Sequence, residues 1–200
     1  NAIIGYSEIL IEDEGGTATQ KCKDLTSIRT AGYRLLGLIN DLLELSRLEA
    51  GKVELRIEEV ESTDLIADLV SRSSAAIKAS GNELCVQPIP TGRFACDVQK
   101  LRRVIEGLLS NSSKFTRNGR ITLSVSVHKD SWLITIVDTG VGIAPSQMAS
   151  LFETFGRSED ETASKYGDEV RLGLPLAYRY CKLMGGDLSV RSEVGIGSTV

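Results

Sequence analysis

The sequence has few of the residues that build redox and metal sites. Its four cysteines stand far apart and show no paired spacing, so they predict neither a zinc knuckle nor a disulfide framework and suit a reducing cytoplasm. The single histidine, His128, is expected at the end of a strand as a solvated turn residue. Neither a nucleophilic triad nor a pair of catalytic carboxylates is evident.

Long apolar runs and an excess of positive charge are also missing. No apolar stretch approaches the ~18 residues of a membrane helix, and no signal peptide is visible. The net charge of −4 argues against a nucleic-acid groove. The chain begins without Met inside an apparent helix and ends on an apparent strand, so we expect it to be a fragment. Any membrane span of the parent protein would then lie outside these residues.

Residues 1–51 are expected to form a helical hairpin. Apolar positions recur over residues 1–12, Gly15 and Gly16 break the pattern, and a second amphipathic helix runs over 19–50. Two helices cannot bury its wide apolar stripe alone, which predicts a homodimeric four-helix bundle; packing on the downstream domain is the alternative. The stripe comprises Leu25, Ile28, Leu35, Leu36, Ile39, Leu42, Leu43 and Leu48.

Residues 52–200 mix strands and helices without strict β-α-β alternation, which indicates an α+β fold. A polar, acidic loop is expected over 158–170. Asp97 is expected to cap a helix, and Asn118-Gly119 signals a tight turn. The expected strands are 53–57, 84–86, 121–127, 132–137, 188–191 and 198–200, and the expected helices are 62–79, 97–115 and 172–184.

The run from Asp138 to Ile143 follows an apolar strand directly and reads Asp-Thr-Gly-Val-Gly-Ile. Gly140 and Gly142 lack a Cβ and would let the backbone approach a flat ligand closely. Such runs are common in turns and are weak evidence alone. About 27 residues upstream, however, a predicted helix carries Asn111 and Lys114. Together these residues favour a cavity that binds a base on one side and metal and phosphate on the other.

Several segments, in this order, resemble the catalytic core of sensor histidine kinases. The resemblance implies a dimerising helical hairpin in 1–51 and, in 52–200, a two-layer α/β sandwich that binds ATP, of the type shared with type II topoisomerases and the heat-shock chaperone. In the hairpin, residues 1–10 resemble the phosphoacceptor helix and 41–51 the second dimerisation helix. In the second part, residues 108–116 resemble the asparagine box, 138–143 the first glycine box and 151–155 the phenylalanine box. Three closing segments of the family are matched by residues 172–174, 184–186 and 195–199.

The resemblance implies transfer of the ATP γ-phosphoryl group to a histidine and then to an aspartate of a response regulator. Asp138 would accept a hydrogen bond from the adenine amino group. Asn111 would ligate Mg²⁺, and Lys114 would reach phosphate oxygens as a point charge; these two are the implied catalytic residues. Phe152 and Phe155 would hold the hinge of a lid or simply pack in the core. The implied nucleotide-binding set is Asn111, Lys114, Phe115, Asp138, Gly140, Gly142, Ile143, Phe155, Arg171, Leu172, Gly173, Leu174 and Thr199.

This chain departs from the family pattern in three places. The phosphoacceptor histidine would lie a few residues before Asn1. The family's second asparagine, one helical turn before Asn111, is replaced by Gly107. Two glycines of the last glycine box are replaced in the stretch from Glu169 to Arg171. Either Arg171 compensates by contacting a phosphate, or this stretch swings outward into solvent.

Three functions are therefore weighed. The intact set of Asn111, Lys114 and Asp138 favours an active kinase core, whereas Gly107 and the lost glycines favour a degenerate signalling or dimerisation module. An ATP-hydrolysing relative would need a carboxylate at position 107, and Glu106 should face elsewhere because one residue turns a helix by about 100°. The expected partners are a second copy through residues 1–51 and a receiver domain of a response regulator, with no nucleic acid and no direct membrane contact, in the cytoplasm.

Overall fold

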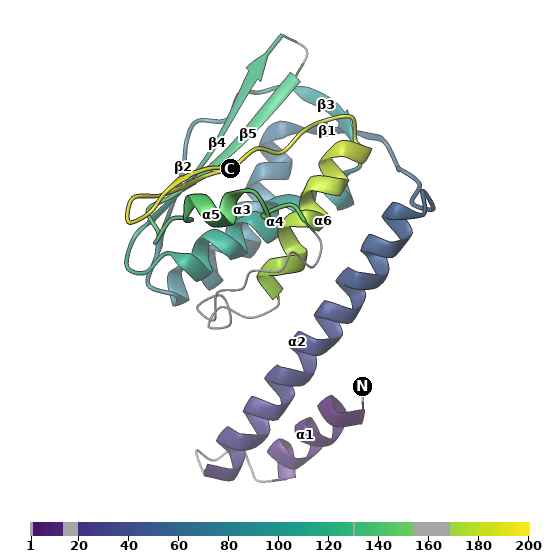
Figure 1. The fold of residues 1–200 in the computed structure, drawn as a ribbon, viewed down its shortest axis with the longest axis vertical. Helices are drawn as coiled ribbons and strands as arrows, with labels where there is room; N and C mark the ends of the chain where they lie inside the picture. The colour runs from purple at the N-terminus through teal and green to yellow at the C-terminus, as the bar shows by residue number, and fades with distance from the viewer. Residues whose placement is uncertain (1, 14–19, 130, 154–168) are drawn as a thin grey trace. The chain divides into compact units, whose positions relative to one another are not determined.

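The computed structural model describes residues 2–13, 20–129, 131–153 and 169–200. The chain divides into two compact units, Asn1–Ala50 and Gly51–Val200. The first unit contains α1 (Ala2–Asp13) and α2 (Gln20–Glu49), which lie side by side (Figure 1). The expected helical hairpin is therefore present.

Close packing between α1 and α2 depends on a glycine. A Cβ on Gly32 would come within 2.8 Å of Ile4 Cγ1, so the missing side chain lets α1 approach α2, and Ile4 and Leu25 are buried. The Tyr33 hydroxyl donates to Glu8 Oε1 at 2.8 Å. Most of the remaining apolar surface of the hairpin is exposed. The exposed large apolar side chains described in the hairpin are Ile3, Tyr6, Ile9, Leu10, Ile28, Tyr33, Leu35, Ile39, Leu42 and Leu43.

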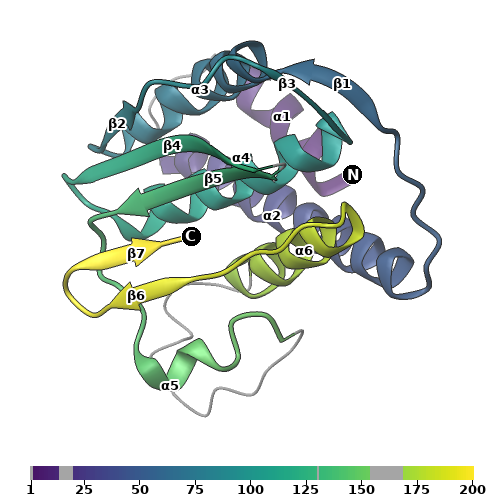
Figure 2. The ribbon, with the colours of Figure 1, turned by 90° about the horizontal axis from the view of Figure 1, so that it is seen from above.

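The second unit is built on a mixed five-stranded sheet in the order β2-β4-β5-β7-β6. Only β2 and β4 pair in parallel. Helices α3, α4 and α6 cover one face of this sheet, which makes two layers (Figures 1 and 2). The expected α+β fold with an α/β sandwich is confirmed. The elements are β1 Glu58–Glu61, α3 Ser62–Ala79, β2 Glu83–Val86, β3 Arg93–Cys96, α4 Val98–Phe115, β4 Arg120–His128, β5 Ser131–Asp138, α5 Pro145–Met148, α6 Glu169–Leu183, β6 Arg191–Glu193 and β7 Gly197–Thr199.

The core of this unit follows from alternation along β4 and from the apolar face of α4. Ile121 and Leu123 are fully buried on the helix side of the sheet, as is Ile136 on β5. Ile105 and Leu109 on α4 are buried as well. His128 ends β4 as an exposed residue, as expected. In the described part of the chain, no helix is long and apolar enough to cross a membrane.

The strand expected at 53–57 is wrong, because the ladder begins at Glu58. β3, which the sequence analysis missed, is only four residues long and pairs Cys96 with Glu58 and Arg93 with Glu61. It ends where Asp97 begins the cap of α4, so residues before 58 find no partner in this ladder. Of the alternating apolar residues in this stretch, Val53 and Leu55 are half-buried and Ile57 is exposed.

Three boundaries near the C-terminus also differ from expectation. The strand expected at 188–191 begins at Arg191, because its three-residue partner β7 reaches only from Gly197 to Thr199. Val200 lies just beyond β7 but exchanges two 2.9 Å hydrogen bonds with Ile136. The helix expected from 172 begins at Glu169, so Pro175 lies inside α6. Most of the acidic loop expected at 158–170 lies outside the described residues.

Candidate nucleotide site

Asp138 ends β5 as a buried carboxylate, with only 7% of its surface exposed. Its Oδ1 accepts hydrogen bonds from the backbone N–H groups of Gly140 at 2.9 Å and Ser198 at 3.3 Å. Its Oδ2 accepts from the Ser112 hydroxyl of α4 at 3.3 Å. Burying a carboxylate is costly unless donors surround it. The structure meets this cost with donors from the loop, from β7 and from α4, and so joins these three segments at one point.

Gly140 and Gly142 let the loop after Asp138 approach the protein's own backbone. A Cβ on Gly140 would lie 2.6 Å from the Phe115 carbonyl oxygen, and one on Gly142 would clash with the carbonyl of Glu193. Gly142 also has a φ of 69°, which disfavours any other residue. Val141 N–H donates to the Phe115 carbonyl at 3.2 Å. The close approach that we expected toward a ligand is thus made here to the end of α4 and to β6.

Ile143 is positioned through a pair of serines that the sequence analysis missed. The Ser192 hydroxyl accepts from Ile143 N–H at 2.8 Å and donates to the Gly197 carbonyl at 2.9 Å. It also lies 2.9 Å from the Ser198 hydroxyl. Since Ser192 has one proton, which it donates to Gly197, Ser198 is the donor in their mutual bond. Serines in short strands carry no distinguishing sequence signal, and only strand pairing revealed these two.

Thr199 does not face Asp138. In the register of β5 and β7 it pairs with Val137, while Ser198 pairs with Asp138. Because neighbouring strand residues point to opposite faces, the Thr199 side chain lies on the other face of the sheet from Ser198. The hydroxyl residue that the structure brings to Asp138 from this strand is therefore Ser198.

Helix α4 begins at a strong cap. The Asp97 side chain accepts from Lys100 N–H at 3.0 Å and from Arg56 N–H at 2.9 Å, and it pairs with Lys100 Nζ at 3.0 Å. Burial raises the pKa of Asp97, but these hydrogen bonds outweigh it and hold the pKa below the usual value. The expected cap at Asp97 is confirmed. It sets where α4 begins and thus the rotation of the residues near its end.

The end of α4 is held by Asn82, a buried residue in the turn between α3 and β2. Its amide nitrogen donates to the carbonyls of Ser113 at 3.1 Å and Thr116 at 2.9 Å, and its amide oxygen accepts from Gly119 N–H at 3.1 Å. Asn82 thereby ties the last turn of α4, which carries Lys114, to the turn before β4. The sequence analysis assigned no role to Asn82.

Asn111 and Gly173 face each other across α4 and α6. A Cβ on Gly173 would lie 4.0 Å from the Asn111 amide nitrogen. Asn111 and Phe115 are half-buried and Lys114 is exposed. These positions place the amide of Asn111 on the side of α4 that faces α6, one residue from the contact between Ser112 and Asp138. The end of α4 and the loop after Asp138 therefore lie against each other, through the contacts of Ser112 with Asp138 and of Phe115 with Val141.

The predicted residues of the phenylalanine box and of α6 are only partly described. Phe155 lies outside the described residues, and Arg171 lies in the first turn of α6 with an undescribed side chain. Leu172 and Leu174 are buried, so they belong to the core. Phe152 packs against Tyr178 of α6 with ring centroids 4.9 Å apart.

Position 107 has room for a side chain. A Cβ there would meet no atom within 4 Å, so crowding does not require a glycine at this position. The neighbouring Glu106 faces α3, where its charge contributes to the raised pKa of Arg72 after the larger effect of Asp68. Glu106 therefore does not take the place of a carboxylate at 107.

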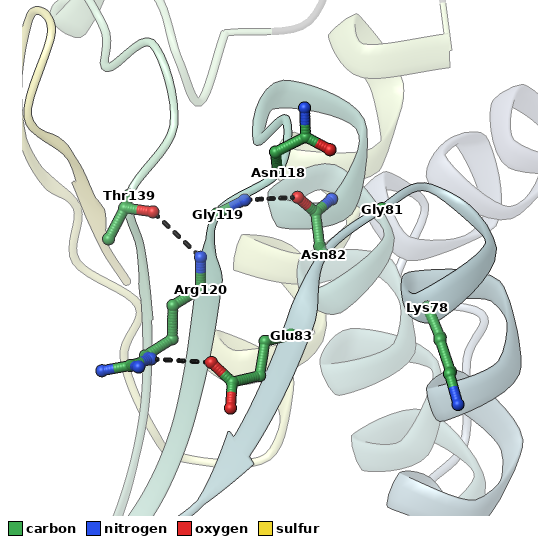
Figure 3. A pocket seen from close by; sticks show the side chains of 8 residues that line it. All are labelled: Lys78, Gly81, Asn82, Glu83, Asn118, Gly119, Arg120 and Thr139. Atoms are coloured by element: carbon green, nitrogen blue, oxygen red, sulfur yellow. Dashed lines mark hydrogen bonds and ion pairs between the residues drawn. The ribbon is translucent and has the colours of Figure 1, made fainter.

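A separate open hollow of about 620 Å³ lies beside the turn before β4 (Figure 3). Arg120 crosses it to Glu83, with Nε and Oε2 3.1 Å apart, and Arg120 N–H donates to the Thr139 hydroxyl at 3.0 Å. Neither Asn111 nor Asp138 lines this hollow, so it is distinct from the convergence described above. The lining residues are Lys78, Gly81, Asn82, Glu83, Asn118, Gly119, Arg120 and Thr139.

Comparison with known proteins places these features in a family. Residues 96–200 match the family described as "Histidine kinase-, DNA gyrase B-, and HSP90-like ATPase". The chain belongs to this family. Residues 1–51 match the "His Kinase A (phospho-acceptor) domain". The chain therefore has the two-part organisation of a sensor histidine kinase catalytic core, which confirms the resemblance seen in its motifs.

Several sensor proteins are similar to this histidine kinase core along its whole length. The aerobic respiration control sensor protein ArcB of Escherichia coli is 32% identical over 202 residues, which are 100% of this chain and 26% of ArcB. The circadian input-output histidine kinase CikA of Synechococcus elongatus is 32% identical over 98% of this chain and 27% of its own length. Hybrid signal transduction histidine kinase B of Dictyostelium discoideum is 32% identical over 100% of this chain and 10% of its own length. The chain thus spans about a quarter or less of these relatives.

Solved structures of histidine kinases share the fold. Full-length ShkA, crystallised in complex with AMPPNP, superposes with a TM-score of 0.77 and 28% identity over 98% of this chain and 41% of ShkA. The histidine kinase AdeS of Acinetobacter baumannii gives a TM-score of 0.72 with 18% identity over 99% of this chain and 91% of AdeS; at that identity the likeness shows the fold alone.

Proposed function

We propose that this chain binds ATP and transfers its γ-phosphoryl group to a histidine that precedes residue 1 in the parent protein. The observation that carries the proposal is the buried Asp138 carboxylate, held by three donors beside the helix that carries Asn111. A carboxylate can only accept hydrogen bonds, so it suits the exocyclic amino group of adenine. The complex of ShkA with AMPPNP supports nucleotide binding by this fold.

Asn111 is the residue that would hold Mg²⁺. An amide oxygen is a hard donor, and Mg²⁺ is commonly bound by one or two protein ligands together with substrate phosphates. The half-buried position of Asn111 opposite Gly173 leaves its amide close to the first turns of α6. A bound Mg²⁺ would neutralise phosphate charge. Lys114, exposed one turn further along α4, would add its own positive charge to the phosphates.

The reaction asks little of this chain beyond positioning. Phosphoryl transfer depends mainly on alignment and on charge neutralisation, and a neutral imidazole is already a nucleophile. The absence of a carboxylate at position 107 argues against activation of water. The residues from Glu169 to Arg171 form the first turn of α6, where backbone N–H groups favour anions. Glu169 and Arg171 stand where the family pattern has glycines, but the helix still begins at this place.

The phosphoryl group would pass from the histidine to an aspartate in a response regulator. The His Kinase A match in residues 1–51 and the exposed apolar side chains of α1 and α2 support a homodimer that closes a four-helix bundle. We place these residues in the cytoplasm, where ATP and receiver domains are found. The parent protein is either soluble or anchored in a membrane by segments outside this chain.

Calorimetric titration with Mg-ATP tests the proposal. The chain should bind saturably, and Asp138→Asn should weaken binding at least about tenfold, because a hydrogen bond to a charged group contributes roughly 1.5–3 kcal/mol. Glu83→Gln, which changes an exposed carboxylate at the hollow of Figure 3, is the matched control and should bind as the unmodified chain does.

Two results would contradict the proposal. A folded chain that binds no nucleotide would favour a degenerate signalling module, and steady ATP hydrolysis that disappears in Glu106→Gln would favour an ATPase. If binding is found, a longer protein that includes the upstream histidine should incorporate labelled phosphate from ATP. Its failure to do so under activating conditions would leave nucleotide binding standing and overturn the kinase activity.

A further inference from the structure

The Asp138 carboxylate has nearly all its acceptor positions filled by the protein. A carboxylate offers about four lone-pair positions. Within the described residues, Gly140 and Ser198 N–H groups take both positions of Oδ1, and the Ser112 hydroxyl takes one position of Oδ2. One position on Oδ2 is left to meet a ligand. The carboxylate is therefore arranged to accept a single donor.

We infer that Ser112 is a specificity-determining residue that aims this last lone pair at the 6-amino group of adenine. The inference rests on the proposed function and adds a residue to it. Ser112 and Asp138 are 4% and 7% exposed, so the contact lies in a poorly solvated place where hydrogen bonds are stronger. The two N–H donors hold Oδ1 and the Ser112 hydroxyl holds Oδ2, so Ser112 completes the set of donors that fixes the rotation of the carboxylate about the Cβ–Cγ bond.

The position of Ser112 on α4 lets one helix serve both ends of the nucleotide. Asn111 and Ser112 are adjacent, so their side chains point about 100° apart around the helix axis. Ser112 points at Asp138, and Asn111 points toward Gly173 of α6. One turn of α4 thus positions both Ser112, which orients Asp138 toward the base, and Asn111, which would bind the metal. A purine that presents a carbonyl instead of an amino group would place two acceptors against each other.

The test measures what the 6-amino group contributes to binding, with and without Ser112. Dissociation constants are determined by calorimetry for Mg-ATP, for the Mg complex of purine riboside triphosphate, which lacks the amino group, and for Mg-GTP. The proteins are the 200-residue chain, Ser112→Ala and Ser113→Ala. Ser113 is the matched control, because it is buried on the same turn of α4 and is not placed in the site.

Removing the Ser112 hydroxyl should weaken the binding of ATP by about 3- to 10-fold, the effect expected for one intramolecular hydrogen bond. Purine riboside triphosphate should be affected much less, so the ratio of the two dissociation constants falls by a similar factor. The preference for ATP over GTP should also fall. Ser113→Ala should keep both ratios, and circular dichroism should show all three proteins folded.

Equal weakening of all three nucleotides by Ser112→Ala would overturn the inference, because it would show a purely structural role. Unchanged affinities would overturn it as well. In both cases the proposed function would stand, since the unmodified chain would bind ATP. Absence of nucleotide binding by the unmodified chain would instead contradict the proposed function, and this inference with it.

Discussion

The protonation state of single buried groups in this protein depends on the hydrogen-bond donors and charges around them. Asp97 is 2% exposed yet stays ionised, because two backbone N–H groups and the Lys100 ammonium replace its water. Two cysteines show the opposite case. Burial, with a smaller contribution from nearby carboxylates, raises the pKa of Cys96 and Cys181 to about 11. Both thiols are protonated at neutral pH and therefore act as small apolar side chains.

Asp97→Ala should lower the free energy of unfolding by about 2 kcal/mol at pH 7, from the lost cap and the unpaired Arg56 N–H. Its folded pKa lies below the ordinary value of 3.8, so its contribution is complete above that value and is lost as the pH falls through the folded pKa. The difference between unmodified and variant proteins, measured by urea unfolding, should therefore shrink below about pH 4.

Asp97→Asn provides the control for that measurement. Asparagine is also a good N-cap, so this variant keeps an acceptor for Lys100 N–H while it removes the charge. It should unfold at a stability between those of the unmodified protein and Asp97→Ala. A difference between the unmodified protein and Asp97→Ala that stays constant from pH 7 to pH 2 would show that the charge contributes nothing.

At the scale of elements, α4 is the part that organises the site, because both of its ends are held. Asp97 caps its start, and Asn82 holds its end to the turn before β4. Between them the helix buries one side on the sheet and carries Asn111 on the side toward α6. Loosening either end should therefore affect nucleotide binding as well as stability.

Asn82→Ala should lower the free energy of unfolding by about 3 kcal/mol, because it leaves two carbonyls and one N–H group of a buried turn without their partner. ATP affinity should fall too, since the last turn of α4 carries Lys114. Urea unfolding and calorimetry measure the two effects. Asn118→Gly is the control, because Asn118 is exposed with a φ of 49° that suits glycine; it should change stability by no more than about 0.5 kcal/mol. An Asn82→Ala protein as stable as this control would refute the role of Asn82.

The whole molecule combines a unit with its own core and a hairpin whose apolar face is left exposed. In the second unit, apolar residues of α4, β4 and β5 are buried against each other. In the first unit, the stripe that includes Ile28, Leu35 and Ile39 stays 46–58% exposed. A contiguous apolar face of this kind marks an interaction site. A second copy of the same hairpin, as proposed above, would cover it symmetrically.

Leu35→Glu should convert the dimer into a monomer, because it would bury a charge in the centre of the bundle. Light scattering during size-exclusion chromatography measures the molar mass. Thr26→Glu is the matched control: Thr26 is an exposed residue of α2 nine positions earlier, about 180° around the helix, and this variant should remain dimeric. A monomeric unmodified chain, or a dimeric Leu35→Glu variant, would refute the proposed interface.

The sequence by itself determined the class of fold and the family, because these depend on local signals. Periodicity indicated the helices, the Asp97 cap and the Asn118-Gly119 turn marked boundaries, and ordered motifs identified the kinase core. Only the tertiary structure decided which residues meet. The partners of Asp138, the use of Gly140 and Gly142 against the protein's own backbone, the hold of Asn82 on α4 and the start of β1 all depend on contacts between segments distant in sequence. Serine and asparagine look the same in a turn and in a buried network, and strand pairing and helix packing decide between them.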